Sequence, residues 1–300
     1  MKKRLTLGAV LAVGALLLLR PGDASQAVRE GLSLCAGTVI PSLFPFFVVV
    51  SLLLQLGLAE LLQSLCAPFM GPVFHLRGAC ALPLLTGLLG GYPAGAKTAA
   101  DLYAQGRLSR QEAEILLGFC DNCGPAFLLG YVGAGVLGDS RAGVYLYLIH
   151  TLSALAAGFV LCRLCPDRGR ALPGRAGAGG TTPFPQALTA AGTGAAASTL
   201  NICAFVVLFR VLAALLPASL PGPCLGVLEM VTGTAALTPG RGGFIAAAAI
   251  VGWGGLSVHC QALSVTAPAG LSFRWHWAGK ALQAGLSAAL AACLAGTLFS

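Results

Sequence analysis

Polar side chains that could do chemistry are rare in this sequence, and several stand beside residues that interrupt helices. Residues 90–97, GGYPAGAK, hold three glycines, a proline and Lys97 within a strongly apolar region. A helix entering here is predicted to unwind at residues 90–93. The N–H groups freed by unwinding favour an anion, and so does the lysine, unless Lys97 extends to the membrane interface instead. The residues predicted to contact such an anion are Gly91, Tyr92, Pro93 and Lys97.

A second interruption, CDNCGP, occupies residues 120–125. Asp121 and Asn122 are the acid and the amide in a stretch that otherwise runs apolar over residues 115–137. Two readings are open for this pair. It contacts the solute, or it caps backbone left free by Pro125. We include Asn122 and Gly124 among the expected binding residues.

The second half of the chain contributes a buried acid and a third interruption. Glu229 lies within the apolar run 225–231, and an acid inside a membrane is costly enough to be functional by default. Proton coupling and a structural pair with Lys97 are both open to it. The third break is predicted at residues 252–261, GWGGLSVHCQ, with His259 and Gln261 facing the solute. His259 either titrates near neutral pH or is a hydrogen-bonded structural histidine.

The cysteines do not indicate a metal site or a disulfide framework. There are eleven, an odd number, scattered mostly through apolar runs, where cysteine behaves as a small hydrophobe. Two CxxC pairs occur, Cys120/Cys123 and Cys162/Cys165, but their settings differ and we predict no metal and no cofactor. The sequence also has no nucleophile–base motif and no nucleotide-binding fingerprint, so we do not expect an enzyme.

Composition places these residues in a lipid bilayer. Hydrophobic residues make up 57% of the 300 and charged residues 9%, with a mean hydropathy of +0.84. A soluble domain carries about 25% charged residues, so this chain is predicted to be a polytopic membrane protein. Its net charge of +8 sits in short connecting segments, as is typical of cytoplasmic loops, and we expect no nucleic-acid partner.

The order of apolar segments predicts an all-α inverted repeat of about seven transmembrane helices and two re-entrant hairpins with broken helices. Ser109 and Glu112 fit a capping box that begins a helix at Arg110. Residues 65–74 and 79–96 are predicted to form the first re-entrant hairpin. The predicted long spans cover residues 32–58, 143–162, 199–216 and 275–299. The predicted domains are an N-terminal span at 1–31, a first repeat at 32–162, a cytoplasmic linker at 163–185 and a second, inverted repeat at 186–300.

Five segments in order resemble the YlbJ or SpoVV family of sporulation integral membrane proteins, which belongs with the nucleoside-recognition or Gate domain proteins. They are PSLFPFF, GLLGGYPAGAK, EAEILLGFCDNCGP, GVLEMVTG and GGLSVHCQ. The resemblance covers nearly all of residues 32–298. One departure is at the second break, where Asp121-Asn122 stands in place of the family's Asn-Asn, which leaves Asp121 without an assigned role.

The resemblance implies a part in spore formation in a Firmicutes-type bacterium. It also implies movement of dipicolinate, a small dianion, across the outer forespore membrane. We therefore expect a multi-pass permease for a small anionic solute. The alternatives are a nucleoside or ion transporter of the same fold, and a non-transporting membrane protein needed for spore-envelope assembly. A homo-oligomer is left open.

Overall fold

The computed structural model describes residues 2–53, 55–56, 59–165, 183–215 and 221–299. Within these residues every regular element is helical, as the sequence predicts. The α-helices are α1 (Lys2–Leu19), α2 (Pro21–Leu34), α3 (Ile40–Leu53), α4 (Ala59–Phe69), α5 (Ala81–Gly90), α6 (Ala94–Ala104), α7 (Arg110–Leu116), α8 (Ser140–Leu164), α9 (Phe184–Ala214), α10 (Met230–Ala235), α11 (Arg241–Trp253), α12 (Gly255–Thr266) and α13 (Arg274–Leu298). Wider π turns form η1 (Cys35–Val39), η3 (Met70–Phe74) and η5 (Ala126–Val136), and tighter 3₁₀ turns form η4 (Gly78–Cys80), η6 (Gly222–Val227) and η7 (Ala267–Ala269).

Several of these helices are long and apolar enough to cross a membrane. Among the described residues there are four such stretches: α8, α9, the α11–α12 pair with its extension to Ala269, and α13. A bent pair, Gln63–Phe74 and Gly78–Gly90, meets at 108° and is either a fifth, broken span or a re-entrant loop. The chain is thus a multi-pass membrane protein. The count of seven spans and two re-entrant hairpins stays a prediction.

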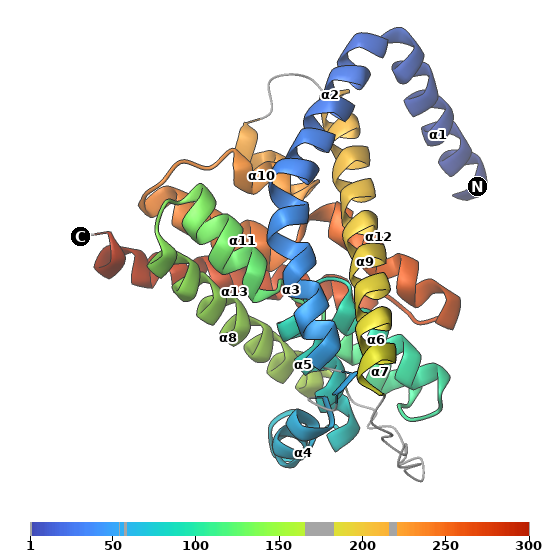
Figure 1. The fold of residues 1–300 in the computed structure, drawn as a ribbon, viewed down its shortest axis with the longest axis vertical. Coiled ribbons are helices and arrows are strands. Elements are labelled where there is room, and N and C mark those ends of the chain that lie inside the picture. The colour runs from blue at the N-terminus through green and yellow to red at the C-terminus, as the bar shows by residue number, and fades with distance from the viewer. Residues whose placement is uncertain (1, 54, 57–58, 166–182, 216–220, 300) are drawn as a thin grey trace.

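Two groups of helices carry the architecture (Figure 1). The helix α2 continues through η1 into α3, and this rod packs along α9. The helices α8, α11 and α13 pack against one another in the second group. The predicted span at 199–216 is too short at its start, because α9 begins at Phe184: the alanine- and threonine-rich residues before Thr199 are helical too. The predicted linker at 163–185 falls largely outside the described residues.

The first two predicted interruptions are present. The helix α5 ends at Gly90 and α6 begins at Ala94, and the two helices pack against each other around the break at 90–93. The capping box at the start of α7 is confirmed, since the Ser109 hydroxyl accepts from the Glu112 N–H and the Glu112 carboxylate accepts from the Ser109 N–H. Regular helix stops after α7 and resumes near Pro125, which leaves an irregular segment over CDNCGP.

The third interruption is much shorter than predicted. Only Gly254 and Gly255 leave the helical conformation, with φ of 89° and 80°, where a side chain would be strained. The expected break over residues 252–261 is therefore wrong in extent, and His259 and Gln261 are residues of α12. The physical reason is that the tandem glycines alone adopt positive φ, while the other residues of GWGGLSVHCQ include no proline and remain in α11 and α12.

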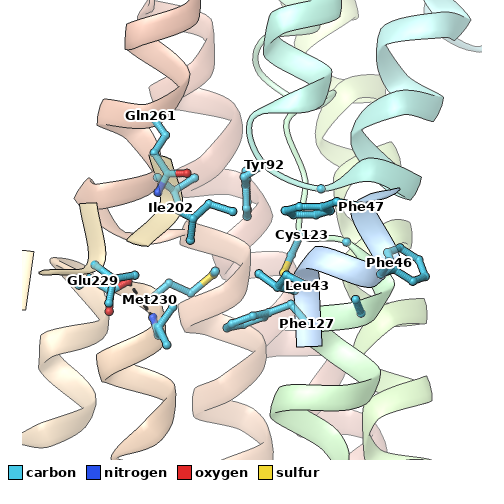
Figure 2. A pocket seen from close by; sticks show the side chains of 16 residues that line it. Leu43, Phe46, Phe47, Tyr92, Cys123, Phe127, Ile202, Glu229, Met230 and Gln261 are labelled. Carbon is cyan, nitrogen blue, oxygen red and sulfur yellow. Dashed lines mark hydrogen bonds between the residues drawn. The ribbon is translucent and has the colours of Figure 1, made fainter. Parts of the chain in front are cut away.

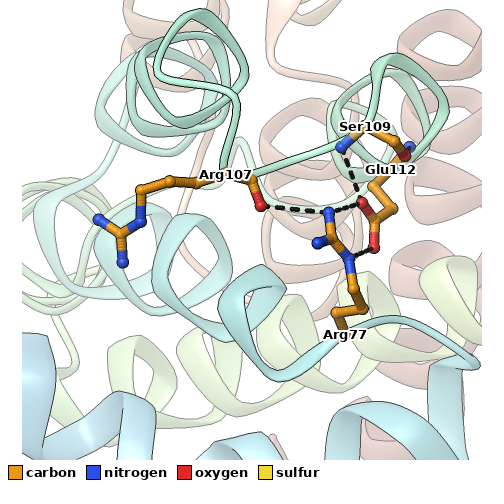
Figure 3. A network of polar contacts seen from close by, with 4 residues as sticks. All are labelled: Arg77, Arg107, Ser109 and Glu112. Atoms are coloured by element: carbon orange, nitrogen blue, oxygen red, sulfur yellow. Dashed lines mark hydrogen bonds and ion pairs between the residues drawn. The ribbon is translucent and has the colours of Figure 1, made fainter. Parts of the chain in front are cut away.

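An ion pair fixes the bent hairpin to the start of α7 (Figure 3). Arg77, in the turn before η4, donates from Nε to Glu112 Oε1 at 2.6 Å and forms a second bond to the other carboxylate oxygen. The same guanidinium donates to the carbonyl of Arg107 at 3.1 Å. Glu112 thus caps α7 and holds Arg77 at once, which positions the hairpin beside the second break.

Candidate functional site

The first and second breaks are packed backbone to backbone. A Cβ on Gly87 or on Gly95 would overlap the carbonyl oxygen of Cys120, so the α5–α6 hairpin holds that carbonyl between two glycines. Between them, a Cβ on Gly91 would lie 3.1 Å from the nitrogen of Gly124. The spacing Gly87, Gly91, Gly95 places the three glycines where the second break needs room. The glycines of this motif therefore serve close approach as well as the turn.

The third break packs against the turn that carries Glu229. A Cβ on Gly255 would lie 3.0 Å from the nitrogen of Met230, and the N–H of Ser257 donates to the carbonyl of Leu228 at 2.9 Å. Each half of the chain thus packs a short helical turn against a broken helix.

One cavity lies where these breaks meet, and both halves of the chain line it. Figure 2 shows Glu229 and Gln261 on one side, facing Tyr92 and Cys123 on the other. The cavity volume is about 40 Å³. The remaining wall is mostly apolar and aromatic, with Leu43, Phe46, Phe47, Phe127, Ile202 and Met230 among its residues.

Five of the nine predicted binding residues line this cavity, and two more line a neighbouring hollow. Pro93 and Lys97 belong to the second hollow, which shares Phe47 and Tyr92 with the first. The Lys97 ammonium is 2.5 Å from the Asp101 carboxylate, and 62% of its side chain is exposed. Asn122 and His259 are buried behind the cavity wall. The cavity residues among the predicted set are Gly91, Tyr92, Gly124, Glu229 and Gln261.

The two polar side chains from the second half differ in how well they are bonded. Glu229 caps α10: its carboxylate accepts from the N–H of Val231 at 2.9 Å, from the N–H of Thr232 at 2.5 Å, and from the Ser257 hydroxyl at 3.4 Å. Gln261 Oε1 is buried and has no hydrogen-bond partner among the described residues. An unpaired buried oxygen costs free energy, so its position beside the cavity suits an acceptor kept for a ligand.

A buried polar network stands behind the second break. Asn122 Nδ2 donates to the carbonyl of Phe119 at 2.7 Å, and Gln283 Nε2 donates to Asn122 Oδ1 at 3.1 Å. The His150 Nε2 accepts from the N–H of Cys123 at 3.0 Å. Lys280 Nζ donates to Gln283 Oε1 at 2.8 Å and to the backbone carbonyl of Asp121. Asn122 therefore holds the break in place through α13.

The histidine predicted at the third break belongs to a second chain of bonds. His276 Nδ1 is 2.9 Å from the carbonyl oxygen of Leu117, so Nδ1 carries the proton and Nε2 is left as an acceptor. His259 Nδ1 lies 2.8 Å from that Nε2, and with a neutral His276 it is the donor of this bond. His259 Nε2 is then an acceptor, and no described residue donates to it.

Lys280 was not predicted, although a signal for it exists in the sequence. The buried residues His276, Lys280, Gln283 and Ser287 recur at intervals of four, three and four, so they share one face of α13. A polar stripe inside a membrane span indicates a buried network rather than lipid contact. The high average hydropathy of the span conceals that stripe.

The described residues contain no group of three or more histidine, cysteine, aspartate or glutamate side chains placed to hold a metal ion. The four cysteines of the two CxxC pairs are buried, and none of them forms a disulfide among the described residues.

Comparison with known proteins finds similarity to a family model and to one curated relative. A family model described as Gate, nucleoside recognition, matches residues 36–161, which include the first two breaks. The sporulation integral membrane protein YlbJ of Bacillus subtilis (strain 168) is 35% identical over 151 residues, which is 50% of this chain and 37% of that protein. The chain thus matches well under half the length of that relative. No solved structure matches the chain.

Proposed function

Because this chain belongs to the YlbJ family of Gate-domain membrane proteins, we propose that it is a permease that moves a small solute across a membrane during sporulation. The observation that carries the proposal is the cavity between the first two breaks and the α10 and α12 segments, lined by Gly91 and Gly124 from one half and by Glu229 and Gln261 from the other. Irregular backbone at membrane depth is tolerated where it lines a cavity, and this is the arrangement of secondary transporters.

We propose that the solute is dipicolinate and that the protein moves it across the outer forespore membrane. The aromatic residues Phe46, Phe47, Tyr92 and Phe127 suit a planar pyridine ring. Gly91 and Gly124 bring backbone outside regular helix to the cavity wall, and N–H groups of such backbone are suited to carboxylate oxygens. Lys97 lies at the neighbouring hollow, where it is suited to attract an anion towards the cavity.

A nucleoside is the second candidate. The cavity is mostly apolar and aromatic, and its polar groups include one amide and one carboxylate, a pattern that fits a neutral aromatic base with hydrogen-bonding edges. The description of the matching family points the same way.

Uptake by the purified protein in liposomes separates these solutes. Labelled dipicolinate should enter faster than in empty liposomes, and excess unlabelled dipicolinate should compete more effectively than a nucleoside. Uptake of the nucleoside alone would establish the second candidate. Failure of both to enter would contradict the permease and favour a structural part in the spore envelope.

A further inference from the structure

Two carboxylates are buried in this protein in opposite surroundings. Glu229 is 2% exposed and accepts the three hydrogen bonds described above. Asp121 is fully buried, and neither of its carboxylate oxygens has a hydrogen-bond partner of normal geometry among the described residues; the backbone N–H of Ala96 is the donor beside it. An ionised carboxylate is stabilised by donors, and burying one without them is expensive. Glu229 therefore suits a permanent structural charge, and Asp121 suits a group that carries a proton.

The lysine next to Asp121 is in the reverse situation. Lys280 is fully buried, and its Nζ donates to the carbonyl of Asp121 and to Gln283 Oε1. The nitrogen also lies 5.2 Å from the centre of the Tyr92 ring, where the ring face attracts a cation. These partners favour the charged ammonium. The Asp121 carboxylate receives no bond from it. The nearby ammonium favours an ionised Asp121 and burial without donors opposes it, so a proton that binds Asp121 leaves the positive charge of Lys280 unbalanced.

The other titratable groups around the pair do not cancel that charge. Three histidines, from α8, α12 and α13, face Lys280, and the hydrogen bonds already described are satisfied with His259 and His276 both neutral. The remaining neighbours of the pair are Tyr92 from the first break, the Cys120 and Cys123 thiols from the second, His150, and the backbone of Ala96 on α6.

The position of the pair links it to the cavity. Tyr92 and Cys123 line the cavity and also stand beside Lys280 or Asp121. A movement of the second break that opens the cavity to one side would carry Asp121 with it. A solute anion in the cavity would in turn face the positive charge of Lys280 across the Tyr92 ring, with the Glu229 carboxylate, already bonded to the start of α10, on the opposite wall (Figure 2).

We propose that Asp121 is the proton-carrying group of a proton–anion symport, with Lys280 as its fixed counter-charge for the anion. This inference rests on the proposed permease function and deepens it. On the entry side, one proton from water forms an O–H bond with the Asp121 carboxylate. On the exit side, that bond breaks and the proton returns to water. No electrons are transferred.

The transport test uses labelled dipicolinate, liposomes and an imposed proton gradient. With the outside more acidic, uptake by the wild-type protein should rise several-fold. Asp121→Asn keeps the shape of the side chain and cannot release a proton, so its uptake should be the same with and without the gradient. Asp139→Asn is the matched control, because Asp139 caps α8 far from the network by accepting from the N–H of Arg141. Gradient-driven uptake by Asp121→Asn equal to that of the wild type would overturn the proposal.

A second measurement needs no transport. At neutral pH the infrared spectrum of the purified wild-type protein should contain the carbonyl band of a protonated carboxylic acid, and Asp121→Asn should lose that band. A wild-type spectrum without the band, or an unchanged band in Asp121→Asn, contradicts the proton-carrying role. If the band is present and assigned to Asp121 while the wild-type protein moves no dipicolinate, the protonated state is supported and the proposed solute is the part that fails.

Discussion

The hydroxyl of Tyr92 donates to the carbonyl of Val251 at a distance of 3.3 Å, across 159 positions of sequence. Tyr92 belongs to the first break and Val251 to α11, just before the third. One side chain thus joins the two halves of the chain at the wall of the cavity. Its ring faces Lys280 on the other side. The Tyr92 ring therefore forms a partition between the solute cavity and the buried network around Lys280.

Removing the Tyr92 hydroxyl should have a small effect, and removing the ring a large one. Tyr92→Phe loses one hydrogen bond and keeps the partition, so we expect a loss of about 1 kcal/mol in stability and retained uptake. Tyr92→Ala should cost about 3–5 kcal/mol and abolish uptake, since it opens a void between the cavity and Lys280. Thermal unfolding in detergent and liposome uptake measure the two effects. Equal losses in the two variants would show that the ring does not form the partition.

Gly95 should not tolerate a methyl group. Gly95→Ala drives a Cβ into the carbonyl of Cys120, which cannot move without displacing the second break, so we expect about 1–3 kcal/mol of destabilisation and loss of uptake. Gly192→Ala in α9 is the control, because no atom lies within 4 Å of the added methyl group. The control should be neutral or stabilised by about 0.5–1 kcal/mol. A Gly95→Ala protein as stable as the Gly192→Ala protein would contradict the close packing of the two breaks.

Two glutamines on the polar faces should respond oppositely to leucine. Gln261→Leu removes an oxygen that lacks a partner, so stability should hold or rise. It also removes the amide N–H₂, which can donate to a solute carboxylate, so the KM for dipicolinate should rise about tenfold. Gln283→Leu removes bonds to Lys280 and Asn122, so stability should fall by about 2 kcal/mol or more. Thermal unfolding measures the stability of the two variants, and initial rates of dipicolinate uptake measure their KM. Loss of stability in Gln261→Leu with an unchanged KM would assign Gln261 to the structural network instead.

The stability contributed by Glu112 should disappear in acid. Burial alone raises the pKa of this carboxyl, but the hydrogen bonds from Arg77 and Ser109 outweigh it, and the pKa lies below the ordinary value of 4.5. Because the folded pKa is the lower one, the contribution is fully present above the pKa of the unfolded chain, about 4.3, and is lost as pH falls through the folded pKa.

Unfolding temperatures measured from pH 7 to pH 3 test this. Glu112→Gln should be less stable at pH 7 by about 2 kcal/mol and should lose this part of the acid dependence. Glu30→Gln, which breaks the more exposed pair with Arg210, should change stability by about 1 kcal/mol or less. If the unfolding temperatures of the wild type and Glu112→Gln fall in parallel between pH 7 and pH 3, Glu112 is not the source of the acid dependence.

The sequence was most informative where glycine, proline and caps dictate local geometry. The unwinding at residues 90–93 and the capping box at Ser109 follow from the chemistry of single residues, and both are confirmed. The third break was overestimated, because the tandem glycines at 254–255 absorb the whole change of direction. The start of α9 was missed because small residues such as Ala and Thr gave little hydropathic signal before Thr199.

The site was harder to predict than the breaks. Five predicted residues line one cavity, but proximity in sequence to a break did not reveal which side chains point into it. Lys97 follows the first break directly and is bonded to Asp101 on its own helix. Lys280 lies far along the chain from any break and reaches the second one only through the packing of α13. Such long-range contacts are set by tertiary structure, not by local pattern.

Initial uptake of labelled dipicolinate by liposomes containing wild-type protein or Gln261→Leu tests the central claim most directly. The wild type should exceed empty liposomes, and the variant, folded to the same extent, should need about tenfold more solute for the same rate. Wild-type uptake no greater than that of empty liposomes, or identical concentration dependence in the two proteins, would contradict the assignment of this cavity as the solute site.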